Sequence, residues 1–134
     1  MKMIPVTVLT GFLGSGKTTL LSHLLRHPEM GRTAVIINEF GEMGLDHELV
    51  ETSEEDFVEL TTGCLCCRLR DDLVLTLHDL LARRRREEVT AFNQIVIETT
   101  GLADPAPILQ TLASDVALAE TLKLANVVTT VDAL

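Results

Sequence analysis

The chain has 134 residues, the length of one domain, and 46% of them are hydrophobic, which is enough for a core without disulfide bonds or a structural metal. The net charge of -9 argues against a nucleic-acid partner, because such proteins need a basic surface. No apolar run approaches the about 20 residues that span a bilayer, and the start of the chain lacks the long apolar region and cleavage site of a signal peptide. We therefore expect a cytoplasmic protein with no membrane partner and with reduced cysteine thiols.

Short apolar runs alternate with helical patterns along the chain. Five runs predict strands, at 6–9, 34–37, 57–60, 95–97 and 127–131. Three stretches predict helices: one with Leu20, Leu21, Leu24 and Leu25 on one face, one with Leu69, Leu73, Leu77 and Leu80 on one face, and one that Pro105 and Pro107 open. The acidic segment 39–56 predicts a long functional loop. The run Arg83–Arg86 predicts the solvated end of the second helix.

This alternation predicts an α/β fold, with a parallel sheet that helices cover on both faces. Ligands of such sheets bind at the carboxyl ends of the strands. Because each irregular loop follows a predicted strand, we expect all of these loops to gather at one edge of the sheet. The chain stops at Leu134, directly after the last predicted strand, so we expect residues 1–134 to be one domain cut from a longer protein.

The segment GFLGSGKT, from Gly11 to Thr18, matches G-x-x-x-x-G-K-[ST] at every fixed position. Its glycines let backbone N–H groups turn toward an anion, and the helix that follows points its positive end at the phosphates. Lys17 is expected to reach the β- and γ-phosphates, and the Thr18 hydroxyl to bind Mg²⁺. An apolar run before the motif and a helical pattern after it strengthen the prediction. The nucleotide-binding residues predicted in this way are Gly11, Gly14, Ser15, Gly16, Lys17, Thr18, Thr19 and Gly101.

Phosphate-binding enzymes of this type hold Mg²⁺, or its water, with a carboxylate at the end of a neighbouring strand. Glu98, directly after the apolar run 95–97, is the predicted carboxylate and a predicted catalytic residue together with Lys17; the alternative is a solvated acid. Gly101 follows as a predicted switch glycine. A second predicted switch spans 38–46, where Asp46 is either a ligand of the Mg²⁺ shell or a solvated loop acid. Leu102 stands where a catalytic Gln is expected, so we predict slow hydrolysis, with water positioned by backbone and Glu98 or with a partner required.

All the cysteines of the chain fall within four residues, at Cys64, Cys66 and Cys67. Soft sulfur ligands favour Zn²⁺, Cu⁺ or Co²⁺ over Mg²⁺, so the cluster predicts a transition-metal site. In an extended segment Cys64 and Cys66 face one way and Cys67 the other. Either a turn at Gly63 brings the three thiolates together, or two thiolates bind and another loop supplies the rest, with Glu42 and His47 as donors. Three buried structural thiols are the remaining alternative.

Taken together, these motifs resemble those of the CobW-like metallochaperone GTPases. The segments that carry the resemblance are 11–18, 38–42, 63–67 and 98–101, in this order. The resemblance implies a SIMIBI-class P-loop fold, slow hydrolysis of GTP with Mg²⁺, and Zn²⁺ or Co²⁺ at the C-x-C-C motif. It also implies that nucleotide and metal binding are coupled and that the metal passes to a client protein. Ile37, before Asn38, is apolar where some relatives carry an acid.

The guanine-selecting Asn-Lys-x-Asp motif of that family is absent from the chain, as is its C-terminal domain. The prediction that the nucleotide is GTP rather than ATP therefore rests on the resemblance. Two other functions stay open: a metal-binding or metal-sensing module in which hydrolysis is incidental, and an ATP-dependent small-molecule kinase. The kinase needs a lid over its acceptor, and no Arg-rich lid segment is present.

Overall fold

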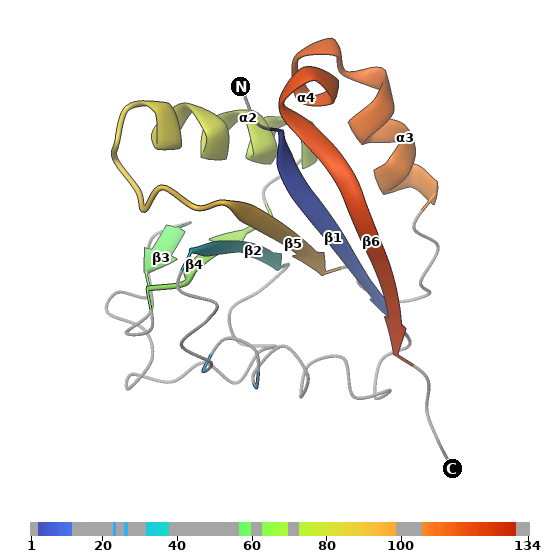
Figure 1. Cartoon of the computed structure of the whole chain (residues 1–134), viewed down its shortest axis with the longest axis horizontal. Coiled ribbons are helices and arrows are strands. Elements are labelled where there is room, and N and C mark those ends of the chain that lie inside the picture. The colour runs from blue at the N-terminus through green and yellow to red at the C-terminus, as the bar shows by residue number, and fades with distance from the viewer. Residues whose placement is uncertain are drawn as a thin grey trace.

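The computed structural model describes residues 3–11, 23, 26, 32–37, 57–59, 63–69, 73–98 and 106–130. In these ranges the strands form one sheet in the order β3-β4-β2-β5-β1-β6. Their bounds are β1 (Ile4–Gly11), β2 (Thr33–Ile37), β3 (Phe57–Glu59), β4 (Leu65–Arg68), β5 (Gln94–Glu98) and β6 (Leu122–Thr130). Figure 1 shows β6 and β1 side by side at one end of the sheet and β3 at the other.

Five of the strands, β4, β2, β5, β1 and β6, run parallel in neighbouring pairs, and β3 pairs antiparallel with β4. The prediction of an α/β fold with a parallel sheet is therefore confirmed. Continuous burial explains the parallel arrangement: every residue of β2 is buried, and so are the last four of β5. Such strands need cover on both faces, which parallel sheets receive from their crossover connections.

The described helices are α2 (Leu73–Arg85), α3 (Ala106–Ser114) and α4 (Val116–Thr121), and all three lie on one side of the sheet (Figure 1). The connections β4–α2–β5 and β5–α3–α4–β6 each pass over one strand in the same direction. Because such crossovers are right-handed, they place their helices on the same face. The predicted helix around 20–25 is described only at His23, which is helical. No helix in the described ranges is long and apolar enough to cross a membrane.

Successive residues of each strand point to opposite faces of the sheet, so the buried side chains fall into two groups, one on each face. The helix-side core joins strand residues such as Val8, Ile36 and Ile97 to Leu77 and Leu80 of α2. The residues between them in sequence belong to the opposite face, which we call the second face. Its buried members are Leu9, Thr33, Val35, Ile37, Cys64, Cys66, Val96 and Glu98.

Helix α2 begins four residues later than Leu69, which the sequence pattern included in it. The Leu69 N–H donates to the Ile37 carbonyl oxygen at 2.6 Å, which continues the pairing of β4 with β2 past Arg68. This strand-like bond holds Leu69 in extended backbone, while its side chain still packs against the helix-side core. The predicted apolar stripe is present, but its first residue, Leu69, extends strand β4 and does not belong to α2.

The arginine run ends α2, as predicted, but two of its side chains pack on aromatic rings. The Arg83 guanidinium lies 4.3 Å from the centroid of the Phe57 ring in β3. Arg84 lies 5.3 Å from the Phe92 ring centroid, and its Nε donates to the Phe92 carbonyl oxygen at 2.8 Å. Cation–π contacts and charge-assisted hydrogen bonds therefore anchor this helix end.

The region before β6 contains a helix that the apolar pattern missed. Asp115 caps α4, where its Oδ1 accepts a hydrogen bond from the Leu118 N–H at 3.0 Å. The same carboxylate lies 3.0 Å from Nε2 of His78, and so ties α4 to α2. Strand β6 then starts at Leu122, five residues before the predicted run. The start of α3 agrees with the prediction, because Pro107 is its second residue.

Candidate functional site

Strands β1 and β5 bring the start of the phosphate-binding motif next to a buried carboxylate. Gly11 is the last residue of β1, and Glu98 is the last residue of β5. The two strands are parallel neighbours, with Leu9 opposite Glu98. Neighbouring strands are about 4.8 Å apart, so Glu98 stands beside the backbone that leads into the motif. Its side chain is 5% exposed. The sheet therefore places Glu98 at the end of the strand next to the one that leads into the motif, and its role as a Mg²⁺ ligand stays a prediction.

The residues level with Glu98 form a row across the carboxyl end of the second face. Leu9 is its partner on one side, and the pairing of Ile36 with Ile97 makes Ile37 its neighbour on the other. Ile37 in turn pairs with Arg68 of β4. The row therefore carries one acid and one base separated by Ile37. Arg68 was not predicted as a site residue, although a charged residue that ends a buried run is the same signal that identified Glu98.

Most of the other predicted site residues lie outside the described ranges. They are Gly14, Ser15, Gly16, Lys17, Thr18, Thr19, Glu42, Asp46, His47 and Gly101. Their assignments remain predictions from sequence. The described part of the predicted site consists of Gly11, Glu98 and the three cysteines.

The cysteine segment is a turn followed by a strand. Gly63 adopts a positive φ of 93°, a conformation that glycine takes at little cost, and β4 begins two residues later. The Cys64 thiol donates to the Thr33 carbonyl oxygen at 3.3 Å. Cys66 and Cys67 are both in β4 and therefore point to opposite faces of the sheet. Cys67 belongs to the helix-side core, whereas Cys64 and Cys66 belong to the second face.

All three thiols are buried, and the pKa values of two of them are raised. For Cys66 the hydrogen bond to the Cys64 thiol raises the pKa most, followed by burial and by the charges of Cys64 and Cys67. For Cys67 burial raises the pKa most, and the Arg83 guanidinium lowers it only in part. Both groups are therefore neutral thiols at pH 7, and a metal that binds them must displace their protons.

The turn at Gly63 lies at the opposite edge of the sheet from Gly11. It joins the antiparallel strands β3 and β4, so it stands at the amino end of β4, where Cys64 lies beside Thr33. The expectation that every irregular loop gathers at the carboxyl edge is wrong for this turn. That expectation assumed parallel strands throughout, whereas the β3–β4 pair reverses the chain direction. Further along β4, Cys66 and then Arg68 also lie on the second face, and Arg68, the last residue of the strand, reaches the carboxyl edge of the sheet.

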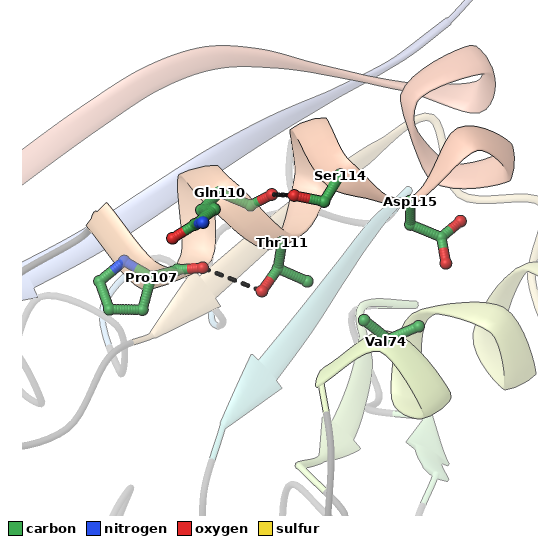
Figure 2. A pocket seen from close by; sticks show the side chains of 6 residues that line it. All are labelled: Val74, Pro107, Gln110, Thr111, Ser114 and Asp115. Carbon is green, nitrogen blue, oxygen red and sulfur yellow. Dashed lines mark hydrogen bonds between the residues drawn. The ribbon is translucent and has the colours of Figure 1, made fainter.

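A separate open pocket of about 530 Å³ lies on the helix side of the molecule. Figure 2 shows Val74 of α2 facing residues of α3 across this space. Its lining consists of Val74, Pro107, Gln110, Thr111, Ser114 and Asp115. None of these is a predicted site residue. Within the described ranges, no group of three or more His, Cys, Asp or Glu side chains is arranged to hold a metal ion.

Comparisons with known proteins match the motifs and the fold. The family model described as "CobW/HypB/UreG, nucleotide-binding domain" matches residues 5–134. The zinc chaperone YjiA of Escherichia coli is 44% identical over 133 residues, which is 99% of this chain and 42% of that protein. The zinc-regulated GTPase metalloprotein activator 1 of Schizosaccharomyces pombe is 42% identical over 135 residues, which is 96% of this chain and 32% of that protein.

Solved structures give the same result. The Zn(II)-bound YjiA GTPase of E. coli superposes with a TM-score of 0.77 at 43% identity, over 96% of this chain and 40% of that one. A Zn(II)-bound triple mutant of YjiA gives a TM-score of 0.80 at 40% identity. The chain spans less than half the length of these relatives. The predicted P-loop nucleoside triphosphatase fold and the predicted resemblance are both confirmed: the chain belongs to the CobW/HypB/UreG nucleotide-binding domain family.

Proposed function

We propose that this chain is the nucleotide-binding part of a metallochaperone that binds GTP, hydrolyses it slowly and couples its nucleotide state to the binding and transfer of zinc or cobalt. The observation that carries the proposal is the position of Glu98, a buried carboxylate beside the strand that ends at Gly11. It shares the second face of the sheet with the thiols of Cys64 and Cys66. The relatives' names, zinc chaperone and zinc-regulated GTPase metalloprotein activator, support the same function.

The proposed nucleotide site comprises Gly11 to Thr19 and Gly101. Lys17 and backbone N–H groups would bind the phosphates, and Thr18, Glu98 and Asp46 would hold Mg²⁺ directly or through its water. The donor set fits that ion, because Mg²⁺ in phosphate sites takes one or two carboxylates together with phosphate oxygens. When bound, Mg²⁺ neutralises charge on the phosphates. Glu98 contributes a carboxylate from the last residue of β5, next to the strand that ends at Gly11.

Hydrolysis in this proposal is slow because the residue after Gly101 is Leu102, which cannot orient a water molecule. The backbone and Glu98 position the water, or a partner supplies the missing group. Slow turnover suits a switch, since the GTP-bound state must last long enough for the metal to be delivered. The expected intrinsic rate is below about 1 s⁻¹.

The metal site uses the cysteine segment, because thiolates select Zn²⁺ or Co²⁺ over the Mg²⁺ at the phosphates. Cys66 pairs in register with Val35 of β2, one side-chain row from the row of Glu98. Strand spacing and rise put the Cα atoms of Cys66 and Glu98 about 12 Å apart. At this separation the proposed Mg²⁺ and the transition-metal ion would occupy distinct sites on one sheet. A client metalloprotein in the cytoplasm is the proposed recipient of the metal.

Nucleotide binding by Lys17→Ala tests the proposal, with Lys123→Ala, an exposed residue of β6, as the matched control. The expected result is loss of GTP binding and of nucleotide-dependent zinc release in Lys17→Ala, with both properties kept in Lys123→Ala. If Lys17→Ala binds GTP as the unmodified chain does, the phosphate site is misassigned. If zinc binding and transfer persist unchanged without nucleotide, the chain is a metal-binding module with incidental hydrolysis.

A further inference from the structure

The pocket between α2 and α3 takes no part in the proposed GTP and zinc chemistry. Its apolar surface comes from Val74 of α2 and Pro107 of α3. The remaining lining residues are polar: Gln110, Thr111, Ser114 and Asp115. Figure 2 shows the Thr111 and Asp115 side chains pointing toward α2, with Val74 facing them across the space. Apolar and polar lining groups therefore face the same opening.

The two hydroxyl groups of the lining can only accept hydrogen bonds from a ligand. Thr111 Oγ1 donates its proton to the Pro107 carbonyl oxygen at 2.9 Å, a bond drawn in Figure 2. Ser114 Oγ likewise donates to the Gln110 carbonyl oxygen at 2.6 Å. A hydroxyl has one proton to donate and two lone pairs that accept. Because both protons are used within α3, these oxygens favour a ligand that donates.

Asp115 adds a negative charge to the same lining. Its Oδ2 lies 3.0 Å from His78 Nε2, and its Oδ1 accepts from the Leu118 N–H at 3.0 Å. The His78 contact, and next the Leu118 bond, lower the pKa of Asp115, so the carboxyl group is ionised at neutral pH. A carboxylate has about four acceptor positions, which these two contacts do not exhaust. The lining therefore favours a donor that is also a cation.

The two helices around the pocket bring little positive charge to it. Helix α3 has no basic residue in its last turn, where a cation would be favourable. The arginine run of α2 begins at Arg83, nine residues and about 13 Å along the helix from Val74. The net charge of -9 also attracts basic partners over longer distances. A cation that fits this pocket is thus available from a partner molecule.

We propose that the pocket binds a lysine side chain on the surface of a partner protein. The aliphatic stem of the lysine packs along Val74 and Pro107, and its ammonium group donates to Asp115 and Thr111. Lysine fits better than arginine, because a guanidinium pairs best with both oxygens of a carboxylate at once, and both Asp115 oxygens already have partners. The pocket is on the helix side of the sheet and Glu98 on the second face, so this site is independent of the proposed GTP and zinc function.

Titration of the full chain with a capped tripeptide that has a central lysine tests the proposal, with binding followed by the NMR shifts of backbone amides. The expected result is a saturable shift confined to Val74 and residues 110–118. A norleucine counterpart, which lacks the charge, is expected to bind at least about fivefold more weakly. Asp115→Asn is expected to weaken lysine binding at least about fivefold, and Thr111→Val about threefold. Gln110→Glu adds a charge to the lining and is expected to tighten lysine binding about two- to fivefold.

The matched control is Glu120→Gln, which removes one negative charge at an exposed position of α4 and is expected to change lysine binding by less than about twofold. Equal losses in Asp115→Asn and Glu120→Gln would mean general attraction to an acidic protein and would overturn the proposal. Equal binding of the norleucine peptide, tighter binding of an arginine counterpart, or the lack of a saturable shift would also overturn it. Circular dichroism checks that each variant is folded. If Asp115→Asn is unfolded, Thr111→Val and Gln110→Glu decide the result.

Discussion

Glu98 is the register partner of Leu9, two residues before β1 ends at Gly11. This pairing places a buried carboxylate beside the entry to the phosphate-binding motif, at the carboxyl edge where ligands of parallel sheets bind. The relation depends on β1 and β5 being neighbours, although they are separated by more than eighty residues in the chain. It makes Glu98 the described residue whose substitution tests the proposed nucleotide chemistry most directly.

Glu98→Gln is expected to reduce GTP hydrolysis by about 10- to 100-fold, the range typical of lost groups around a bound metal. The amide has nearly the same shape as the carboxylate, so the sheet stays intact while the negative charge near Mg²⁺ disappears. Steady-state release of phosphate, measured over a range of Mg²⁺ concentrations, gives both the rate and the Mg²⁺ requirement. The control is Glu120→Gln, an exposed residue of α4. Equal activity in the two variants would remove Glu98 from the mechanism.

Asp115 is expected to stabilise the fold in a pH-dependent way. The hydrogen bond with His78, and next the one from the Leu118 N–H, lower the pKa of this carboxyl in the folded chain. As the pH falls, the unfolded chain therefore takes up a proton first, starting near its pKa of about 3.9. The contribution of Asp115 to stability is complete above that pH. It is lost as the pH falls through the lower pKa that Asp115 has in the folded chain.

Thermal unfolding of Asp115→Asn and Asp115→Ala checks this expectation. At pH 7 the Ala variant should have the lowest Tm, because Asn still caps the helix and Ala does not. The difference between the unmodified chain and Asp115→Asn should shrink between pH 5 and pH 3. A difference that stays constant over this range would mean that the charge on Asp115 does not contribute.

Zinc binding is expected to become tighter as the pH rises. The hydrogen bond to Cys64, together with burial, raises the pKa of Cys66, so the thiol is protonated near neutral pH. Zinc must displace that proton, and each displaced proton increases the observed affinity about tenfold per pH unit. Isothermal titration at pH 6.5 and 7.5, in buffers with different ionisation enthalpies, measures both the affinity and the number of protons released. A pH-independent affinity would show that the thiols are not the ligands.

The sequence was sufficient to predict the parts of this molecule that depend on local pattern. The strand that ends at Gly11 and the run before Glu98 are apolar and short, and both are strands. The alternation of strands and helices correctly predicted the parallel sheet. The motif from Gly11 to Thr18 predicted the class of nucleotide-binding fold, since few other structures require that spacing.

The remaining features of the fold depend on pairings between strands, which cannot be predicted from local sequence pattern. The sequence-based prediction lacks strand β4, because Cys64, Cys66 and Cys67 indicate a metal cluster, although cysteine is also among the most buried residue types. The antiparallel direction of β3 then reversed the expected position of the turn at Gly63. Leu69 follows the helical stripe but bonds to Ile37 as an extension of β4, because a tertiary hydrogen bond outweighs local periodicity.

The most direct test of the proposed coupling is the zinc affinity of the protein with and without a non-hydrolysable GTP analogue and Mg²⁺. If the nucleotide and metal sites are linked, the two affinities differ, by about 5- to 150-fold for typical coupling energies. Linkage also requires that zinc change the affinity for the analogue by the same factor, which a reciprocal titration measures. We expect a difference of this size, and we expect Glu98→Gln to reduce it. Equal zinc affinities in the two states would contradict the proposed coupling.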